Sequence, residues 1–244
     1  MAELEAGHDW PYSVAWLDCL ASGRAIGRGH VSLAGHAAPG ALTGALAGSS
    51  RAQNPYAFPG RPRFSIPVTA LPGCLNRYTL RGFNTLYYKR QSRRESESLI
   101  DYQRFFYPLD TIANWNRLYG PRGFIQYQCV IPKTESRNAL HKMLDTIAQA
   151  GTGSFLAVLK LFGQQGQGAL SFPMPGYTLA LDFPRTRRLP SLINERDAIT
   201  RDNGGRIYLA KDACMSPGLL RDGYPRYDEF REIKAQVDPY MHLQ

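Results

Sequence analysis

The chain has 244 residues, 43% of them hydrophobic, and carries a formal net charge of +9. That length can bury a core, and no apolar run approaches the roughly 18 residues of a membrane span, so we expect a soluble protein of one or two domains. The acidic N-terminus is unlike a signal peptide, and the dispersed cysteines argue against a zinc site or a disulfide framework, which favours a cytoplasmic protein without a metal.

The positive charge suggests three possible kinds of partner: nucleic acid, an anionic membrane and a phosphorylated substrate. Basic residues cluster only at 87–94 and 185–188, and the chain has no RNA-binding aromatic signature and no helix-turn-helix pattern. We therefore expect no nucleic acid. The two clusters could make peripheral contact with a membrane, although solvated loops are the favoured alternative.

The N-terminal part reads as strands separated by loops. Residues 35–63 are rich in Ala, Gly, Pro and Ser without periodicity, which predicts a long flexible loop. Residues 93–98 form a second loop, of mixed charge. Strands are expected in four stretches with β-type composition, at 12–20, 27–34, 64–70 and 78–88. The first two could pair.

The middle of the chain predicts a short helix and then an alternating strand. Asp110 is a candidate N-cap, and Gly120 follows the end of the helix. In the strand at 123–132, Gln126 and Gln128 face away from Ile125, Tyr127 and Cys129. The two glutamines could line a hydroxyl-rich pocket, or could mark the wet face of an antiparallel sheet.

A lysine interrupts the next strand, after a helix that runs from about Leu140 to Gly151. The run at 154–163 is almost continuously apolar, as in a strand covered on both faces, yet it contains Lys160. Burial of an unpaired ammonium costs several kcal/mol, so Lys160 favours an anion or substrate site. The alternative is that Lys160 and Lys211 only extend into water from strand ends.

The strand at 171–184 has one apolar row and one row of small or polar residues, Thr178, Ala180 and Asp182, that could admit a ligand. A helix then ends near Gly204, a short strand follows at 206–209, and a last helix runs from about Arg226 to Pro239. These elements predict an α+β fold, with a mostly antiparallel sheet and helices packed on one face. The chain has no recognisable phosphate-binding or hydrolase motif, and the Gly/Gln run at 163–168 favours a flexible hairpin loop.

Several segments carry a resemblance that composition could not provide: YSVAWLDCL, FYPLDTIANWNRLYGPRGFIQYQCVIP, FLAVLKLFG, LSFPMPGYTLALDFP and GGRIYLAKDA, followed by YPRYDEF and VDP. In this order they resemble the C-terminal half of FAD-linked oxidases related to decaprenylphosphoryl-ribose 2'-oxidase, among the vanillyl-alcohol-oxidase-like flavoproteins and sugar-lactone oxidases. The resemblance implies a substrate-binding (cap) domain at 1–202, with the flexible loop 35–63, and a segment at 203–244 that returns to a flavin-binding domain. No segment resembles that flavin-binding domain.

The resemblance also implies roles for particular residues. Tyr208 and Lys211 match a Tyr-x-x-Lys pair that approaches FAD and the sugar hydroxyl, and therefore stand as catalytic and cofactor-binding residues. The substrate-binding residues implied are Gln126, Gln128, Lys160, Phe162, Thr178 and Asp182. Thr178 and Ala180 replace an Asn and a Cys that are frequent in the family, which bears on the identity of the sugar.

Two hypotheses follow from the resemblance. The first is an FAD-dependent oxidoreductase that oxidises a secondary alcohol of a sugar or polyprenyl-phosphate sugar by hydride transfer to flavin. The second is a truncated, non-catalytic domain that binds a sugar phosphate and cannot hold flavin alone. Because half of the flavin site is expected to be missing, we expect a colourless preparation, with the flavin-binding domain absent or in another chain.

Overall fold

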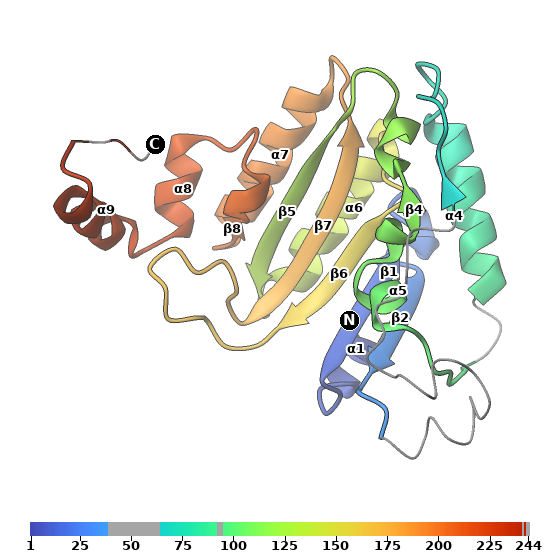
Figure 1. The fold of residues 1–244 in the computed structure, drawn as a ribbon, viewed down its shortest axis with the longest axis horizontal. Coiled ribbons are helices and arrows are strands. Elements are labelled where there is room, and N and C mark those ends of the chain that lie inside the picture. The colour runs from blue at the N-terminus through green and yellow to red at the C-terminus, as the bar shows by residue number, and fades with distance from the viewer. Residues whose placement is uncertain (39–63, 92–94, 241, 243–244) are drawn as a thin grey trace.

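The fold was obtained as a computed structural model that describes residues 1–38, 64–91, 95–240 and 242. Its described part is built around a six-stranded sheet with the order β2-β1-β6-β7-β5-β8, in which all hydrogen-bonded neighbours are antiparallel (Figure 1). The strands are β1 (Tyr12–Leu17), β2 (Gly29–Ala34), β5 (Phe124–Pro132), β6 (Ala157–Phe162), β7 (Gly176–Pro184) and β8 (Arg206–Ile207). The predicted α+β class is confirmed, as is the pairing of the first two strands.

Two helices, α6 (Ser136–Ala150) and α7 (Leu189–Asp202), cover one face of this sheet. Apolar residues recur along α6 with helical spacing, and its Met143 and Ile147 are completely buried with Leu179 of β7 in one core. Gly151 ends α6 with φ +62°, a conformation that glycine adopts at little cost. The predicted helix and its stop are confirmed, and within the described part of the chain the other face of the sheet has no comparable pair of helices (Figure 1).

Helix α4 (Arg77–Gln91) replaces the strand that we predicted at 78–88, so that prediction was wrong. The aromatic and Thr content of this stretch favours strands, but Leu80 and Asn84, four residues apart, are both buried, as on one side of a helix. Asn76 also caps the helix, because its side-chain oxygen accepts hydrogen bonds from the backbone amides of Tyr78 and Thr79 at 2.8 and 3.1 Å.

The described residues before α4 at 64–76, and those between α4 and β5 at 95–123, form only short elements. The strand predicted at 64–70 is limited to β3 (Phe64–Ser65), which pairs in parallel with β4 (Ile112–Ala113). The helix predicted from Asp110 was also wrong, since Asp110 lies in a 3-10 turn and Asn114, with φ +58°, separates that turn from the next. Gly120 does follow the end of the second turn, as expected. The short helices that the described residues form here are α5 (Tyr102–Phe106), η2 (Pro108–Thr111) and η3 (Trp115–Tyr119).

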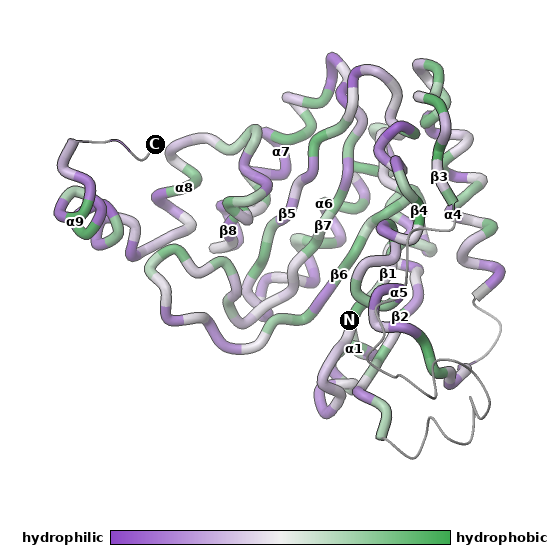
Figure 2. Tube along the Cα trace, in the orientation of Figure 1, coloured by the Kyte–Doolittle hydropathy of each residue, from purple (hydrophilic) through white to green (hydrophobic). Residues whose placement is uncertain are grey.

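The C-terminal part leaves the sheet through η4 (Leu209–Lys211), α8 (Pro217–Gly223) and α9 (Tyr227–Val237). Helix α9 begins and ends where the sequence predicted, and hydrophobic and hydrophilic residues alternate along it (Figure 2). At the other end, α1 (Ala2–Ala6) precedes β1, and η1 (Gly23–Ala25) lies in the β1–β2 connection. Among the described residues, no helix combines the length and apolar character needed to traverse a bilayer.

Three segments singled out in the sequence fall partly outside the described residues: the flexible loop at 35–63, the basic cluster at 87–94 and the mixed-charge loop at 93–98, whose first two positions are not described. The flexible loop at 35–63 does so from residue 39 onward, and the basic cluster at 87–94 does so at its last three positions, while 87–91 belong to α4. The other basic cluster, 185–188, is exposed between β7 and α7. Contact of either cluster with a membrane stays a prediction, as does the domain boundary between residues 202 and 203.

Candidate active site

The two glutamines of β5 lie on the face of the sheet that α6 and α7 leave open. Tyr127 and Cys129 are buried on the helix side, and strand alternation therefore directs Gln126 and Gln128 to the other side, as predicted. The Gln126 amide nitrogen donates to Asp182 Oδ1 at 3.0 Å, and the Gln128 amide nitrogen donates to the Thr178 hydroxyl at 3.1 Å. Each glutamine is thus held by a polar residue of β7.

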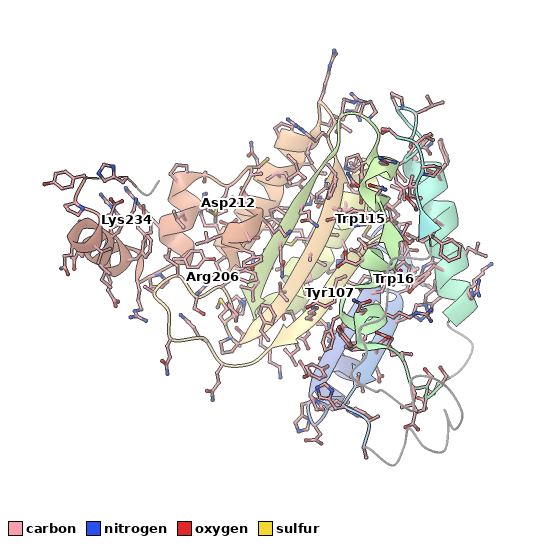
Figure 3. All side chains as sticks on the ribbon, in the orientation of Figure 1. Trp16, Tyr107, Trp115, Arg206, Asp212 and Lys234 are labelled. Carbon is pink, nitrogen blue, oxygen red and sulfur yellow. The ribbon has the colours of Figure 1, made fainter. Side chains whose placement is uncertain are left out.

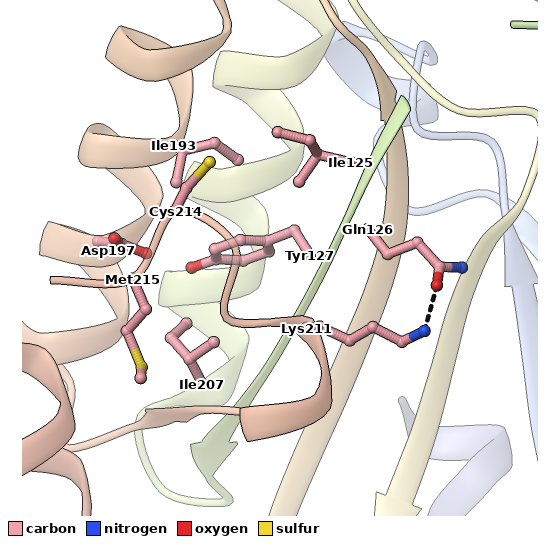
Figure 4. A pocket seen from close by; sticks show the side chains of 9 residues that line it. All are labelled: Ile125, Gln126, Tyr127, Ile193, Asp197, Ile207, Lys211, Cys214 and Met215. Carbon is pink, nitrogen blue, oxygen red and sulfur yellow. Dashed lines mark hydrogen bonds between the residues drawn. The ribbon is translucent and has the colours of Figure 1, made fainter. Parts of the chain in front are cut away.

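Lys211 reaches the same face from the edge of the sheet. The short strand β8 pairs with β5, and the Tyr208 backbone amide donates to the Gln128 carbonyl at 2.8 Å, which anchors the turn that follows. From that turn, the half-buried Lys211 ammonium donates to Gln126 Oε1 (Figure 4). Lys211, Gln126 and Asp182 therefore form one hydrogen-bonded row across three elements.

Asp182 is the buried end of this row, with 3% of its surface exposed. Burial raises the pKa of Asp182 to about 6, against the opposing effects of the Gln126 hydrogen bond and the Lys211 charge. Its Oδ2 atom makes no hydrogen bond of normal length among the described residues, and neither does the buried hydroxyl of Tyr119. The two groups are neighbours. Burial, together with the nearby Asp182 charge, therefore raises the pKa of Tyr119. Sequence reasoning missed Tyr119, which lies in the segment that was predicted as an ordinary helix.

Lys160 lies on the same open face, but it is exposed rather than buried. The prediction that β6 is covered on both faces was therefore wrong, and the ammonium carries no burial cost. Residues directly opposite in an antiparallel pair share a face, and Lys160 is opposite Thr178, the partner of Gln128. Both lysines thus lie on the same side of the sheet, a question that the sequence alone did not answer.

An aromatic chain connects Phe162 of β6 with Tyr208. Phe172 lies between them, with ring centroids 5.8 Å from Phe162 and 4.7 Å from Tyr208. Phe172 is buried and comes from the connection between β6 and β7, where Arg206 donates to the Ser171 carbonyl at 2.9 Å. The sequence singled out Phe162 and Tyr208 but not Phe172, whose only signal was its place in the run SFPMPG.

A small cavity behind the row has no room for a substrate. It lies where Tyr127, Asp197 and Met215 meet beneath β5, and its volume is about 10 Å³ (Figure 4). That is space for one water molecule at most. A ligand would therefore bind on the open face, where Gln126, Lys211 and Tyr208 are partly exposed.

The arrangement suits a hydroxyl-rich, anionic ligand. Gln126, Gln128 and Lys211 are partly exposed and offer amide and ammonium groups. Lys160 is an additional, exposed cation, whereas Thr178, with 1% of its surface exposed, acts only through Gln128. A carboxylate with a raised pKa beside an ammonium is a common feature of sites that move protons. The described geometry therefore favours recognition of a polar, negatively charged molecule on this face.

Comparison with known proteins supports the resemblance. No family model matches the chain. Decaprenylphosphoryl-beta-D-ribose oxidase of Mycolicibacterium smegmatis is 34% identical over 231 residues, which cover 95% of this chain and 49% of the relative. A Streptomyces coelicolor protein described as "Uncharacterized protein in mprA 5'region" is 33% identical over 231 residues, covering 93% of this chain and 62% of the relative. The chain thus spans about half to three fifths of the length of these relatives. Along nearly its whole length, it is a homologue of decaprenylphosphoryl-beta-D-ribose oxidase.

Proposed function

We propose that this chain supplies the substrate-binding part of a flavin-dependent oxidase that acts on a secondary alcohol of a polyprenyl-phosphate sugar. The observation that carries the proposal is the row Lys211–Gln126–Asp182, which ends in an ammonium on the open face. The name of the Mycolicibacterium smegmatis relative specifies an oxidase and a decaprenylphosphoryl ribose, and supports both the reaction type and the substrate class.

The residues at the edge of the open face fit FAD as the cofactor. Tyr208 and Lys211 would hold the ring, since the Lys211 ammonium would stabilise an anionic reduced flavin and Tyr208 is only partly buried. When bound, FAD would supply the hydride acceptor. The described residues contain no complete flavin site, so other groups would have to complete it.

This chain's own residues then orient the sugar and control charge at its hydroxyl. Gln126 is fixed at both ends, because its oxygen accepts from Lys211 while its nitrogen donates to Asp182. Lys211 is therefore held where its charge can stabilise the oxygen of a hydroxyl that loses its proton. Gln128, oriented by the buried Thr178, would bind a further hydroxyl group of the sugar, and Phe162 would pack against the ring.

A binding experiment tests the site directly. Methylphosphoryl-β-D-ribose, which carries the sugar and phosphate without a lipid, is titrated into the chain by calorimetry. Loss of a charge-assisted hydrogen bond costs roughly 1.5–3 kcal/mol, so Lys211→Ala should weaken binding about 10- to 100-fold. Lys142→Ala, at an exposed position of α6 on the covered side, is the matched control and should bind as the wild type does.

Flavin is tested in the same preparation. FAD is added with the ribose probe, and oxidation is followed as loss of the visible absorbance of oxidised flavin. Absence of binding by the wild type, or equal binding by Lys211→Ala, would contradict the proposed site. Binding without flavin reduction would support the substrate site and argue against an oxidase formed by this chain alone.

A further inference from the structure

A large groove runs along the open face beside the candidate active site. Its volume is about 950 Å³, at the upper end of the range for small-molecule sites. One wall is the sheet at β1, β2 and β6, and further walls come from α4, from residues 4–11 and from the segment at 100–115. That last segment crosses in front of the sheet (Figure 1), and Figure 3 labels Trp16, Tyr107 and Trp115 in this region. Its lining includes Val14, Trp16, Phe83, Phe106, Trp115 and Val158.

The lining is predominantly apolar and aromatic. The Trp16 indole nitrogen donates to the Phe155 carbonyl at 3.0 Å, so this ring offers the groove no free donor. Trp16 lies opposite Val158 in the sheet, and both point away from the core. Charged groups are few: Lys160 is on the sheet wall, while Arg104 and Asp110 are exposed on the crossing segment. Such a lining favours a hydrocarbon over a second sugar.

Lys160 and Phe162 belong to both the groove and the candidate active site. Lys160 makes no hydrogen bond or ion pair with the described residues, and it lies opposite Thr178, the partner of Gln128. Along the open face, the order is therefore Lys211 with the glutamines, then the unpaired Lys160, then the apolar groove. A polyprenyl-phosphate sugar has the same order of sugar, anionic phosphate and hydrocarbon.

We propose that the groove binds the isoprenoid chain of the substrate, with Lys160 facing the phosphate. This inference rests on the proposed function, because the sugar end is placed at the row of Lys211. The phosphate would satisfy the free ammonium, and the first isoprene units would displace water from the aromatic walls. Burial of each methylene corresponds to roughly a fourfold gain in affinity before the cost of ordering the chain.

The test compares two probes with the same head group, methylphosphoryl-β-D-ribose and farnesylphosphoryl-β-D-ribose, at concentrations below micelle formation. For the wild type, we expect the farnesyl probe to bind at least about tenfold more tightly. Phe106→Ser and, as a second variant, Val158→Gln should bring the two affinities together without changing that of the methyl probe. Phe230→Ser is the matched control, because Phe230 on α9 is 37% exposed, close to the 40% of Phe106, and lies outside the groove.

The outcomes separate this inference from the proposed function. If both probes bind the wild type with equal affinity, the groove does not bind the isoprenoid chain, while the proposed sugar site is unaffected. Absence of binding by the methyl probe would overturn the sugar site. In that case, binding of farnesyl phosphate would test the groove separately. Binding to the wild type that is weakened by Phe106→Ser would support the groove as the isoprenoid site, and any other result would overturn it. Lys160→Ala should weaken both ribose probes by a similar factor, and an unchanged affinity would overturn the role of Lys160. Circular dichroism confirms that each variant is folded.

Discussion

Replacement of Asp182 by Asn should stabilise the protein at neutral pH. The buried carboxyl has a pKa of about 6, compared with 3.8 for an unperturbed Asp. In the window between these values, the folded state binds more protons than the unfolded state, so ionisation of Asp182 lowers the free energy of unfolding as pH rises. The difference is about two pKa units at about 1.4 kcal/mol each, which gives up to about 3 kcal/mol.

Asn is the suitable replacement because it keeps the shape and cannot ionise. Its oxygen can still accept from Gln126, and its amide nitrogen would take the position of the unpartnered Oδ2 and could donate to the Tyr119 hydroxyl. At pH 4, where Asp182 is largely protonated in the folded state, variant and wild type should have similar stability. By pH 7, Asp182→Asn should be more stable by up to about 3 kcal/mol.

Urea unfolding at several pH values between 4 and 7 measures this difference directly. The free energy of unfolding of the wild type is subtracted from that of the variant at each pH, which cancels the titration of groups common to both. One such group is Asp197, because burial also raises the pKa of its carboxyl to about 6. Asp202→Asn, which removes a carboxylate at an exposed position, serves as the matched control. A flat difference for Asp182→Asn, or a loss of stability at pH 7, would refute the assignment of a buried, destabilising carboxylate.

Three further predictions concern the fold. Asn76→Ala removes the cap of α4 and should lower the free energy of unfolding by about 0.5–2 kcal/mol in urea, and no change would contradict the capping role. Ile147→Ala, in the core under the sheet, should cost about 2–5 kcal/mol by the same measurement, and a cost below 1 kcal/mol would indicate that the core is not packed there. Cys19 and Cys129 are buried, and burial raises the pKa of both thiols to about 12, whereas Cys74 and Cys214 are exposed. Iodoacetamide should therefore modify only Cys74 and Cys214 in the folded protein and all four cysteines in urea, as measured by mass spectrometry. Labelling of Cys19 or Cys129 in the folded protein would contradict the fold.

The sequence predicted best those elements whose burial follows a single period. β5 and β7 alternate between the core and the open face, so a period of two located both the strands and the row of Gln126 and Gln128. α6 has one apolar stripe and a glycine stop, which located the helix and gave its C-terminal limit, although it begins at Ser136 rather than near Leu140. α4 failed because its composition favours strands, while its helical state depends on the Asn76 cap and on burial of only part of one side.

Contacts that depend on tertiary structure were beyond such patterns. The apolar run around Lys160 suggested a strand covered on both faces, but its second side faces the groove, where apolar residues need not be buried by the chain itself. Phe172 lies in the connection between β6 and β7, and Tyr119 ends the short 3-10 helix η3. The position of such segments follows from packing rather than from periodicity.

The two lysines reach one face by different routes, and this difference predicts how each responds to change. Lys160 is placed by strand alternation in β6, so its direction persists as long as the sheet does. Lys211 is placed by a 3-10 turn after a two-residue edge strand and is held on the face by Gln126. Gln126→Leu should therefore release Lys211 and weaken binding of methylphosphoryl-β-D-ribose about as much as Lys211→Ala does. Because Lys160 does not depend on Gln126, the additional loss caused by Lys160→Ala should be the same in the wild type and in Gln126→Leu. Strong coupling between Lys160 and Gln126 in that double-mutant cycle would show that the two cations are not positioned independently.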